Sequence, residues 1–317
     1  SCSKYLDQEP DMRASINTVD KVKRLIASAY PGNNYLAMAE TYSDNVEDKF
    51  VGSLYQPVPS LYFWQDINDS DSDTPTSYWN ACYEAIAAAN HALAAIDQND
   101  FGSEVLPYKG EALVARAYAH FMLVSFFAKV YDKTAGAAND SQGIPYVTEP
   151  ETVVIKQYDR GTVASVYENI RKDLEEGLAL LDAGGGSWTV PKYHFTPAAA
   201  HAFAARFYMF TGEWQKVVDN ANAIFAGGNF AGKLVPYNST FKTLGFESVR
   251  TEFTKAEQPY NLLITETYSG YDRWWDNRYA MGVSVFQDIY NGTTATGAKL
   301  YNFGISYGAP HYTTYIW

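Results

Sequence analysis

The segment 105–131 restricts the fold of this chain more than any other part of its sequence. Its spacing predicts a helix with apolar side chains on most sides, interrupted by residues such as Glu111, Arg116, His120 and Lys129. A helix that is apolar nearly all round must be buried on several faces. The sequence therefore predicts a mainly α-helical protein with this helix at its centre.

Five further stretches carry a one-sided apolar stripe, in which apolar residues recur at spacings of three and four, as in amphipathic helices. They predict helices over about 19–30, 77–96, 163–183, 197–211 and 213–225. Thr162 and Thr196 are expected to cap two of them. Gly212 separates the last two helices by one residue, which predicts an antiparallel helix pair. The order Tyr208, Gly212, Trp214 resembles the interior of a tetratricopeptide unit, without the strict repeat of a full array.

The stretches 31–76 and 229–317 lack these stripes. The second contains 19 aromatic residues among 89, which is too many for a solvated tail, and short pieces such as 260–265 are predicted to be strands or buried loops. We expect one domain over 1–317. In it, a helical-repeat-like part over 17–228 supports an irregular, aromatic-rich part over 229–317 that binds ligand.

The charge of the chain and its two cysteines limit the possible partners. The net charge is −12 without any basic run, so nucleic-acid binding is not expected, because it needs a basic surface to neutralise phosphates. No apolar run reaches the roughly 18 residues of a membrane-spanning helix. Cys82 falls on an apolar stripe and is expected to be buried. Cys2, next to the start, is a candidate site of lipid attachment after signal-peptide cleavage.

No motif in the sequence supports catalysis or a resident metal. The run 304–308 matches the pattern of a nucleophile elbow, but too few residues follow Ser306 for the acid and histidine of a hydrolase triad. The five histidines show no metal-ligand spacing, and no phosphate-binding glycine loop precedes a helix. The oxygen-rich segment 66–73 lacks the glycine and glutamate of an EF-hand, so a solvated acidic turn is favoured over a calcium site.

Aromatic residues make up 16% of the chain, and two clusters of them fall in predicted loops beside polar side chains. Tyr and Trp rings can stack on the C–H faces of sugars while neighbouring amides and carboxylates hydrogen-bond the hydroxyl groups. The candidate ligand-binding residues are Tyr62, Trp64 and Asn68 in the first cluster and Tyr271, Trp274 and Trp275 in the second. The alternative is that these rings only fill the junction between the helices and the irregular part.

Short pieces of sequence occur in a fixed order over nearly the whole chain. They are Cys2–Asp7, Ala29-Tyr30-Pro31, Ser43-Asp44, Tyr83–Ile86, Ala89-Asn90, Gly110-Glu111-Ala112, Arg116-Ala117-Tyr118, Gly143-Ile144-Pro145, Val166-Tyr167, Asp173-Leu174, Phe195-Thr196 and Ala204-Ala205-Arg206. Each piece is weak alone, but the ordered set resembles the RagB/SusD family of bacterial nutrient-binding lipoproteins.

The resemblance implies tetratricopeptide-like helix pairs that support an irregular ligand-binding half. It implies a non-catalytic protein on the extracellular face of the outer membrane, anchored through a lipid on Cys2. Such proteins bind glycans, or in some cases peptides, and cover a TonB-dependent transporter of the SusC type. In starch-binding relatives an arc of aromatic rings holds the sugar, and Trp64, Tyr271, Trp274 and Trp275 lie in similar stretches here. Because family members are usually longer, the chain is expected to be truncated at its C-terminus.

We therefore expect a cell-surface lipoprotein that captures oligo- or polysaccharide by aromatic stacking and passes it to the transporter. A peptide-binding member would use backbone pairing and pockets in place of flat rings. A helical-repeat scaffold that binds only the transporter would bury the loop aromatics. Solvent exposure of Trp64, Trp274 and Trp275 distinguishes the first of these from the last.

Overall fold

The computed structural model describes residues 16–67, 70–150, 157–237, 239–267, 277–280, 282 and 285. It is mainly α-helical, as the sequence predicts. The chain forms two compact units: unit 1 contains Ser1–Pro31 and Cys82–Thr265, and unit 2 contains Gly32–Ala81 and Glu266–Trp317. Among the described residues, no helix combines the length and the apolar character needed to cross a membrane. The assignment of 1–317 to one family domain stays a prediction.

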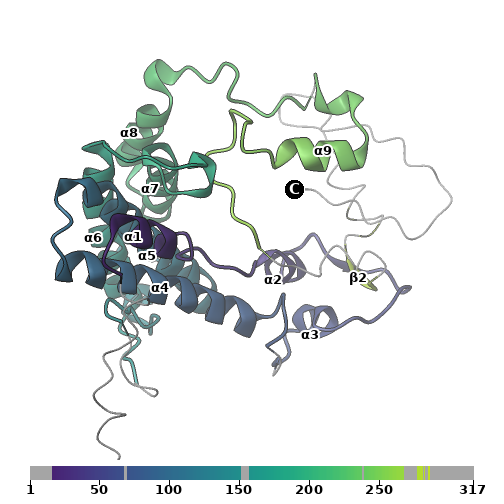
Figure 1. Ribbon diagram of the computed structural model, residues 1–317. Coiled ribbons are helices and arrows are strands. Elements are labelled where there is room, and N and C mark those ends of the chain that lie inside the picture. Colours follow the sequence, from purple (N-terminus) through teal and green to yellow (C-terminus); the bar gives the residue numbers. More distant parts are fainter. Residues whose placement is uncertain are drawn as a thin grey trace, which may run out of the picture. The chain divides into compact units, whose positions relative to one another are not determined.

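Unit 1 is a set of packed helices joined by loops and short 3-10 turns (Figure 1). Its helices are α1 (Val19–Ile26), the part of α4 (Pro75–Gln98) after Ala81, α5 (Leu106–Phe127), α6 (Val163–Asp182), α7 (Pro197–Thr211), α8 (Trp214–Ile224) and α9 (Phe246–Phe253). The 3-10 turns are Ser103–Val105, Ala137–Asp140, Pro191–Tyr193, Ala226–Gly228 and Phe241–Thr243. Helix α5 packs along α6, and α7 packs along α8 (Figure 1), so the helix pair predicted across Gly212 is confirmed.

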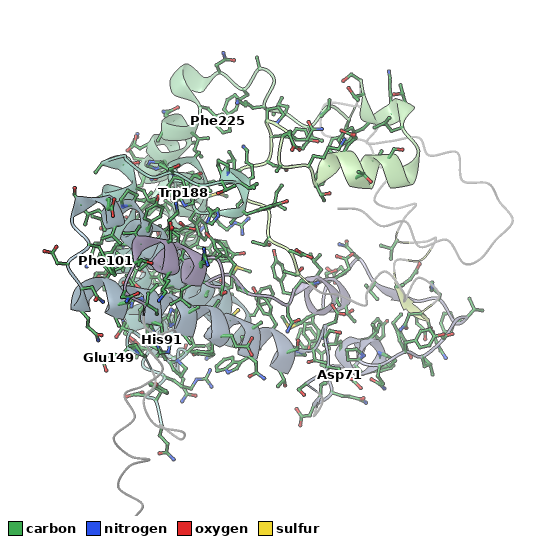
Figure 2. The ribbon with its side chains drawn as sticks, viewed as in Figure 1. Asp71, His91, Phe101, Glu149, Trp188 and Phe225 are labelled. Atoms are coloured by element: carbon green, nitrogen blue, oxygen red, sulfur yellow. The ribbon has the colours of Figure 1, made fainter. Side chains whose placement is uncertain are left out.

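Helix α5 forms the centre of unit 1, as its apolar sequence predicts. Sixteen of its 22 residues are buried. It approaches α6 closely because two glycines leave room: a Cβ atom on Gly110 would lie 2.8 Å from the carbonyl oxygen of Gly177, and one on Gly177 would lie 2.7 Å from a methyl group of Val114. A buried apolar cluster joins α5 to α1 and α4, with Phe101 and Trp188 packed against it (Figure 2).

The two predicted caps differ in outcome: Thr162 caps α6 with its side chain, whereas Thr196 is the N-cap residue of α7 but its side chain makes no capping hydrogen bond. Thr162 and Ser165 form a capping box at the start of α6, in which each side chain accepts a hydrogen bond from the other residue's backbone N–H. Pro197 occupies the first turn of α7, and Gly212 ends that helix at a φ of 77°. Cys82 on α4 is fully buried, as predicted.

A buried ion pair ties α4, α5 and α6 to the loop 144–148. The guanidinium of Arg116 donates two hydrogen bonds of 2.7 Å to the carboxylate of Asp173 and one of 2.9 Å to Asn90. It also donates to the carbonyl of Thr148, and the Tyr146 hydroxyl donates to Asp173. Burial opposes the charge on Arg116, but the bonds to Asp173 outweigh this effect and raise the pKa of the guanidinium.

His120 supports the same loop as a neutral side chain. Its Nε2 accepts a hydrogen bond of 3.0 Å from the backbone N–H of Val147, and its ring stacks on that of Tyr146 with centroids 3.8 Å apart. Burial lowers the pKa of His120 to about 3, so the ring is uncharged at neutral pH. His120 is thus a packing residue of unit 1.

Three side chains converge on the buried carboxylate of Glu111. The Tyr30 hydroxyl and the Trp188 indole donate hydrogen bonds of 2.7 and 2.6 Å to it, and Nδ1 of His194 lies 2.7 Å away. The backbone N–H of Phe195 donates to the Tyr30 hydroxyl. Most of the pieces that carry the family resemblance therefore take part in buried contacts of unit 1, where they hold helices together.

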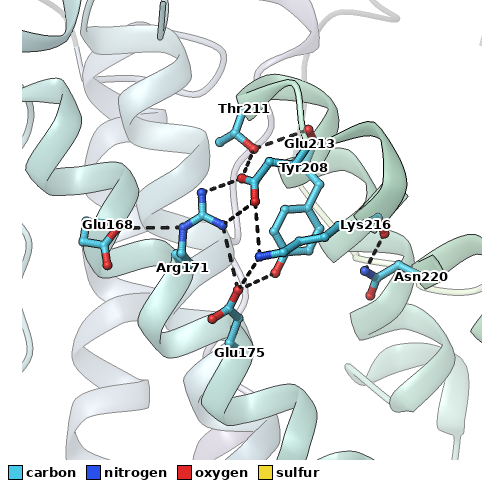
Figure 3. A network of polar contacts seen from close by, with 8 residues as sticks. All are labelled: Glu168, Arg171, Glu175, Tyr208, Thr211, Glu213, Lys216 and Asn220. Carbon is cyan, nitrogen blue, oxygen red and sulfur yellow. Dashed lines mark hydrogen bonds and ion pairs between the residues drawn. The ribbon is translucent and has the colours of Figure 1, made fainter. Parts of the chain in front are cut away.

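Charged side chains join α6 to the α7–α8 pair at the surface of unit 1 (Figure 3). Arg171 donates hydrogen bonds of 3.0 and 2.6 Å to Glu213, and Lys216 lies 3.2 Å from Glu213 and 3.1 Å from Glu175. Burial opposes ionisation of Glu213, but its hydrogen bonds, chiefly from Arg171, lower its pKa to about 2. The carboxylate of Glu213 therefore stays charged and fixes the turn between α7 and α8 to α6.

Unit 2 combines two segments that lie far apart in the sequence. It contains α2 (Leu36–Thr41), β1 (Glu47–Asp48), α3 (Val58–Tyr62), the first turns of α4 and β2 (Tyr279–Ala280). The two strands are antiparallel, with Glu47 opposite Ala280 and Asp48 opposite Tyr279. This pairing joins the early loop region to the segment after position 276.

Two stretches that we expected to be irregular contain short helices. These are α2 and α3 within 31–76 and α9 within 229–317. The prediction was wrong there because helices of one or two turns leave little periodic signal and depend on tertiary contacts. The described stretch 260–265 contains no strand; it is a loop, but it is half-buried and not buried as expected.

Candidate functional site

Aromatic side chains in unit 2 link its two sequence segments. The ring of Tyr62, the last residue of α3, stacks on Tyr279 of β2 with centroids 4.4 Å apart. Phe63 meets the same Tyr279 ring edge-on at 5.3 Å. Tyr62 and Tyr279 also pack with the buried Val46 and Val58. Tyr62, which the sequence placed in a loop, is thus a helical residue that contributes to the core of unit 2.

Of the two predicted rings that the structure describes, that of Trp64 is the more exposed. Its side chain is 72% exposed, and its indole stacks on the ring of Tyr42 with centroids 4.2 Å apart and an interplanar angle of 20°. Partial burial raises the pKa of Tyr42, so its hydroxyl stays protonated. Among the described residues Tyr42 stacks on one face of the indole, and the exposure of Trp64 leaves ring surface open to a flat apolar ligand.

The backbone holds Trp64 in an unusual conformation. Its φ is 54°, in the left-handed region that favours glycine. Its N–H donates to the carbonyl of Leu61, and the N–H of Gln65 donates to the carbonyl of Ser60. These two bonds form the Schellman motif, which ends many helices and commonly carries glycine at the left-handed position. A tryptophan at this position projects from the end of α3.

A second exposed ring lies next to the β1–β2 pair. The guanidinium of Arg278 donates hydrogen bonds of 2.6 and 2.7 Å to Asp48, and these bonds lower the pKa of that carboxyl group. The same guanidinium lies 5.7 Å from the ring centroid of Phe50, which is 79% exposed at a φ of 60°. Unit 2 therefore holds two large rings, Phe50 and Trp64, in left-handed conformations at its surface.

Several predicted residues lie outside the part that the structure describes. These are Cys2, Asn68, Tyr271, Trp274 and Trp275. Their roles stay predictions.

The described residue Asn277 follows Trp275 by two positions in the sequence. Its side-chain amide donates a hydrogen bond of 3.0 Å to the carbonyl of Tyr55, and the N–H of Arg278 donates to the carbonyl of Ser53. Residues 277 and 278 thus lie beside the segment that leads to α3.

The sequence pointed to Tyr62 and Trp64 but missed Tyr42, Phe50 and Tyr279. Their contacts connect different segments, so no local spacing signals them. The signal available in the sequence was the high density of tryptophans, because unit 2 holds five of the seven in about one third of the chain. Among the described residues, no group of His, Cys, Asp and Glu is arranged to hold a metal ion. The arrangement offers flat rings and hydrogen-bonding groups for non-covalent binding.

Unit 1 offers a different kind of site. A cavity of about 430 Å³ is lined by Thr18, Val19, Asp20, Lys23, Glu104, Tyr108 and Gly185. The ammonium group of Lys23 lies over the ring of Tyr108, 4.9 Å from its centroid, and Tyr108 is buried. This cavity presents charged groups and no open aromatic face, which makes it less suited to a sugar than the surface around Trp64.

Comparison with protein families gives a match over most of the chain. A family model for SusD-like proteins, described as starch-binding and associating with the outer membrane, matches residues 4–209. This range is more than half of the 317 residues. No curated protein matches the chain significantly.

Solved structures of similar fold come from Bacteroides. A SusD superfamily protein from Bacteroides thetaiotaomicron is 23% identical, with a TM-score of 0.56 over 70% of this chain and 49% of its own. A SusD-like carbohydrate-binding protein from Bacteroides vulgatus is 17% identical, with a TM-score of 0.58 over 78% of this chain and 50% of its own. A further Bacteroides vulgatus protein is 22% identical, with a TM-score of 0.64 over 86% and 62%. The chain thus spans roughly half to three fifths of these proteins, and the likeness shows the fold.

Proposed function

Because the chain belongs to the SusD-like family, we propose that it binds glycans and captures oligo- or polysaccharide by aromatic stacking in unit 2. The proposal includes a lipid anchor on Cys2, a place on the extracellular face of the outer membrane, and transfer of the glycan to a TonB-dependent transporter of the SusC type. The description of the family as starch-binding and associating with the outer membrane supports this assignment. The proposed binding involves no catalytic step.

The observation that carries the proposal is the conformation and exposure of Trp64. A bulky residue in the left-handed region is strained, and such strain persists mainly where the surroundings enforce it, often at binding sites. Burial does not explain this tryptophan, because its side chain is 72% exposed. The stack on Tyr42 fixes the plane of the indole and so reduces the entropy lost when a ligand binds.

The geometry favours a glycan over a peptide as the ligand. One open ring face matches the apolar face of a pyranose, whereas peptide binding by β-augmentation needs an exposed strand edge. The strands of unit 2 in the described part have two residues each, which is too short for such an edge. The exposed Trp64 also disfavours a scaffold that binds only its transporter, in which the loop aromatics would be buried.

The experiment is a titration of the protein with soluble polysaccharides, followed by intrinsic tryptophan fluorescence and by retardation in native affinity gels. Casein digests serve as the peptide control. We expect saturable binding of at least one polysaccharide and none of the digests. Binding of the digests alone would overturn the proposal, and so would the absence of binding across a broad panel.

Two variants locate the binding. Trp64→Gly removes the ring at a position where glycine is conformationally favoured, and we expect it to weaken binding about tenfold, equivalent to about 1.4 kcal/mol. Trp214→Ala is the matched control, because Trp214 is 59% exposed but belongs to α8 of unit 1. The affinity of this variant for the polysaccharide should stay within about twofold of that of the parent. Equal affinity of Trp64→Gly and the parent in affinity gels would exclude Trp64 from the site. Trp274→Ala tests the second predicted cluster in the same way.

A further inference from the structure

The two units differ in charge as well as in aromatic content. Unit 2 contains twelve Asp and Glu and four Lys and Arg, so it carries a formal −8 of the chain's net −12 in about one third of the residues. Within 32–81 there are eight acidic residues and one basic residue, Lys49. The described cation of the later segment, Arg278, is neutralised by its two hydrogen bonds to Asp48. Unit 2, which carries these aromatic rings, is therefore strongly acidic in its sequence.

Two of these carboxylates belong to residues close in sequence to Trp64 and Tyr42. Asp44 follows Tyr42 by two residues, and Asp66 follows Trp64 by two residues; both are exposed. Within the described part of the chain, neither carboxylate has an ion pair or a hydrogen bond. Two residues of chain span at most about 7 Å between Cα atoms, so each of these carboxylates is carried by a residue close to one that forms the stack.

These charges have a consequence for ligand choice. A pyranose that lies on Trp64 would approach an acidic part of unit 2, in which Asp44 and Asp66 are exposed. Hydroxyl groups can hydrogen-bond to carboxylates, whereas a uronate or sulfate group would be repelled by them and would find no unpaired cation among the described side chains beside the stack. An uncharged sugar meets no such repulsion.

We propose that Asp44 and Asp66 make the Trp64–Tyr42 site selective for uncharged glycans by repelling polyanionic ones. This inference rests on the proposed function and adds the substrate class. The two carboxylates act through their charge on a ligand that is bound by the rings.

The experiment uses polysaccharides that share a backbone and differ in charge. The probes are laminarin and pullulan, each before and after carboxymethylation, and polygalacturonan with and without methyl esters. Retardation of the full chain in native affinity gels gives the ratio of the dissociation constants of the charged and uncharged forms. At low ionic strength we expect the charged form of a binding backbone to bind about fivefold more weakly. Screening by added salt should bring the ratio towards one.

Two double variants test whether Asp44 and Asp66 cause the weaker binding of the charged polysaccharides. In Asp44→Asn/Asp66→Asn the ratio should fall to about twofold or less. The control, Glu84→Gln/Asp140→Asn, changes the net charge by the same amount at exposed positions of unit 1 and should keep the parent ratio. Tighter binding of the charged forms, or an equal shift in both double variants, would overturn the inference while glycan binding stands. No retardation by any probe would instead contradict the proposed function, and the inference with it.

Discussion

Two helices of this protein, one in each unit, end with the same hydrogen bonds but with different residues. At the end of α7, Gly212 has a φ of 77°, and the N–H of the next residue donates to the carbonyl of Tyr208 at 2.9 Å. At the end of α3, Trp64 has a φ of 54°, and the N–H of the next residue donates to the carbonyl of Ser60, also at 2.9 Å. The backbone geometry is the same at both ends, but glycine has no side chain and tryptophan has the largest one.

The difference shows what each unit requires at this geometry. The left-handed conformation costs a residue with a side chain about 1–2 kcal/mol, a cost that glycine avoids. In unit 1 the motif only has to turn the chain between α7 and α8, and Gly212 does so without strain. In unit 2 the motif keeps a strained tryptophan whose ring is open to solvent. This contrast agrees with the proposed function, in which the packed helices of unit 1 support the fold and the exposed ring of Trp64 binds ligand.

The largest expected effect is on the buried contacts of unit 1. Arg116→Met leaves Asp173 as an unpaired buried carboxylate and should lower the free energy of unfolding by about 3–5 kcal/mol. Urea denaturation followed by far-UV circular dichroism measures this loss. Because the ion pair belongs to unit 1 and to no ring of the proposed site, the fraction that remains folded should bind glycan with the parent affinity.

Lys109→Met is the control for this prediction. It breaks the ion pair between Lys109 and Asp97, whose carboxylate side chain is 65% exposed. An exposed pair contributes less than about 1 kcal/mol. If both variants lost the same free energy of unfolding, the buried ion pair would contribute no more to the stability of unit 1 than an exposed one.

The next effect is at the helix end of unit 1. Gly212→Ala should lower the free energy of unfolding by about 1–2 kcal/mol, because alanine is strained at a φ of 77°. The added Cβ atom would lie 3.1 Å from Cδ of Lys133, a flexible side chain that can move away. Chemical denaturation of the two proteins measures the difference. An unchanged midpoint would show that the left-handed conformation costs little here, and would weaken the argument from Trp64.

The two helix ends should also respond differently to acid. Glu213 follows Gly212 and is held by Arg171, with a pKa of about 2 against an ordinary value of 4.5. Its folded-state pKa is depressed, so its contribution to stability is complete above about pH 4.5 and is lost as the pH falls towards 2. We expect a loss of about 1 kcal/mol, after allowance for screening of this partly exposed group. The residue after Trp64 is Gln65, which does not titrate.

Urea denaturation of the parent and of Glu213→Gln over the same pH range tests this prediction. The difference between them should be greatest near neutral pH and should shrink in acid. A difference that does not change with pH would mean that the charge of Glu213 adds nothing to the turn.

The sequence predicted unit 1 well because its signals are local. The stripe of α5, the cap at Thr162 and the break at Gly212 are each readable within a few neighbouring residues, and all three are confirmed. The pieces that carry the family resemblance belong mostly to this unit. Their buried contacts, such as Arg116 with Asp173, explain why a resemblance can identify the fold without identifying a ligand.

The site in unit 2 could be predicted only in part, because its contacts are not local. Trp64 could be predicted because it is a tryptophan beside polar residues. Nothing in the sequence spacing pairs it with Tyr42, and nothing joins Asp48 to Arg278, which lies 230 residues later. Sequence patterns also gave no reason to place Trp64 in a left-handed conformation, where glycine is expected. Such a departure from local preference is informative once the structure shows it, because the strain needs a reason.

The smallest effect on stability gives the sharpest test of the comparison. Trp64→Gly relieves the strain of the left-handed conformation, which is worth about 1 kcal/mol. It also loses the stack on Tyr42, which is worth about 0.5–1.5 kcal/mol. Because the two effects oppose each other, its free energy of unfolding should stay within about 1 kcal/mol of the parent value. Trp64→Ala loses the same stack and keeps the strain. It should therefore be about 1 kcal/mol less stable than Trp64→Gly, while both bind glycan equally poorly. The glycine protein would then be more stable than the alanine protein by the same free energy of unfolding at positions 64 and 212. If alanine at position 64 matched glycine, the strain at Trp64 would vanish as evidence for function, and only its exposure would remain.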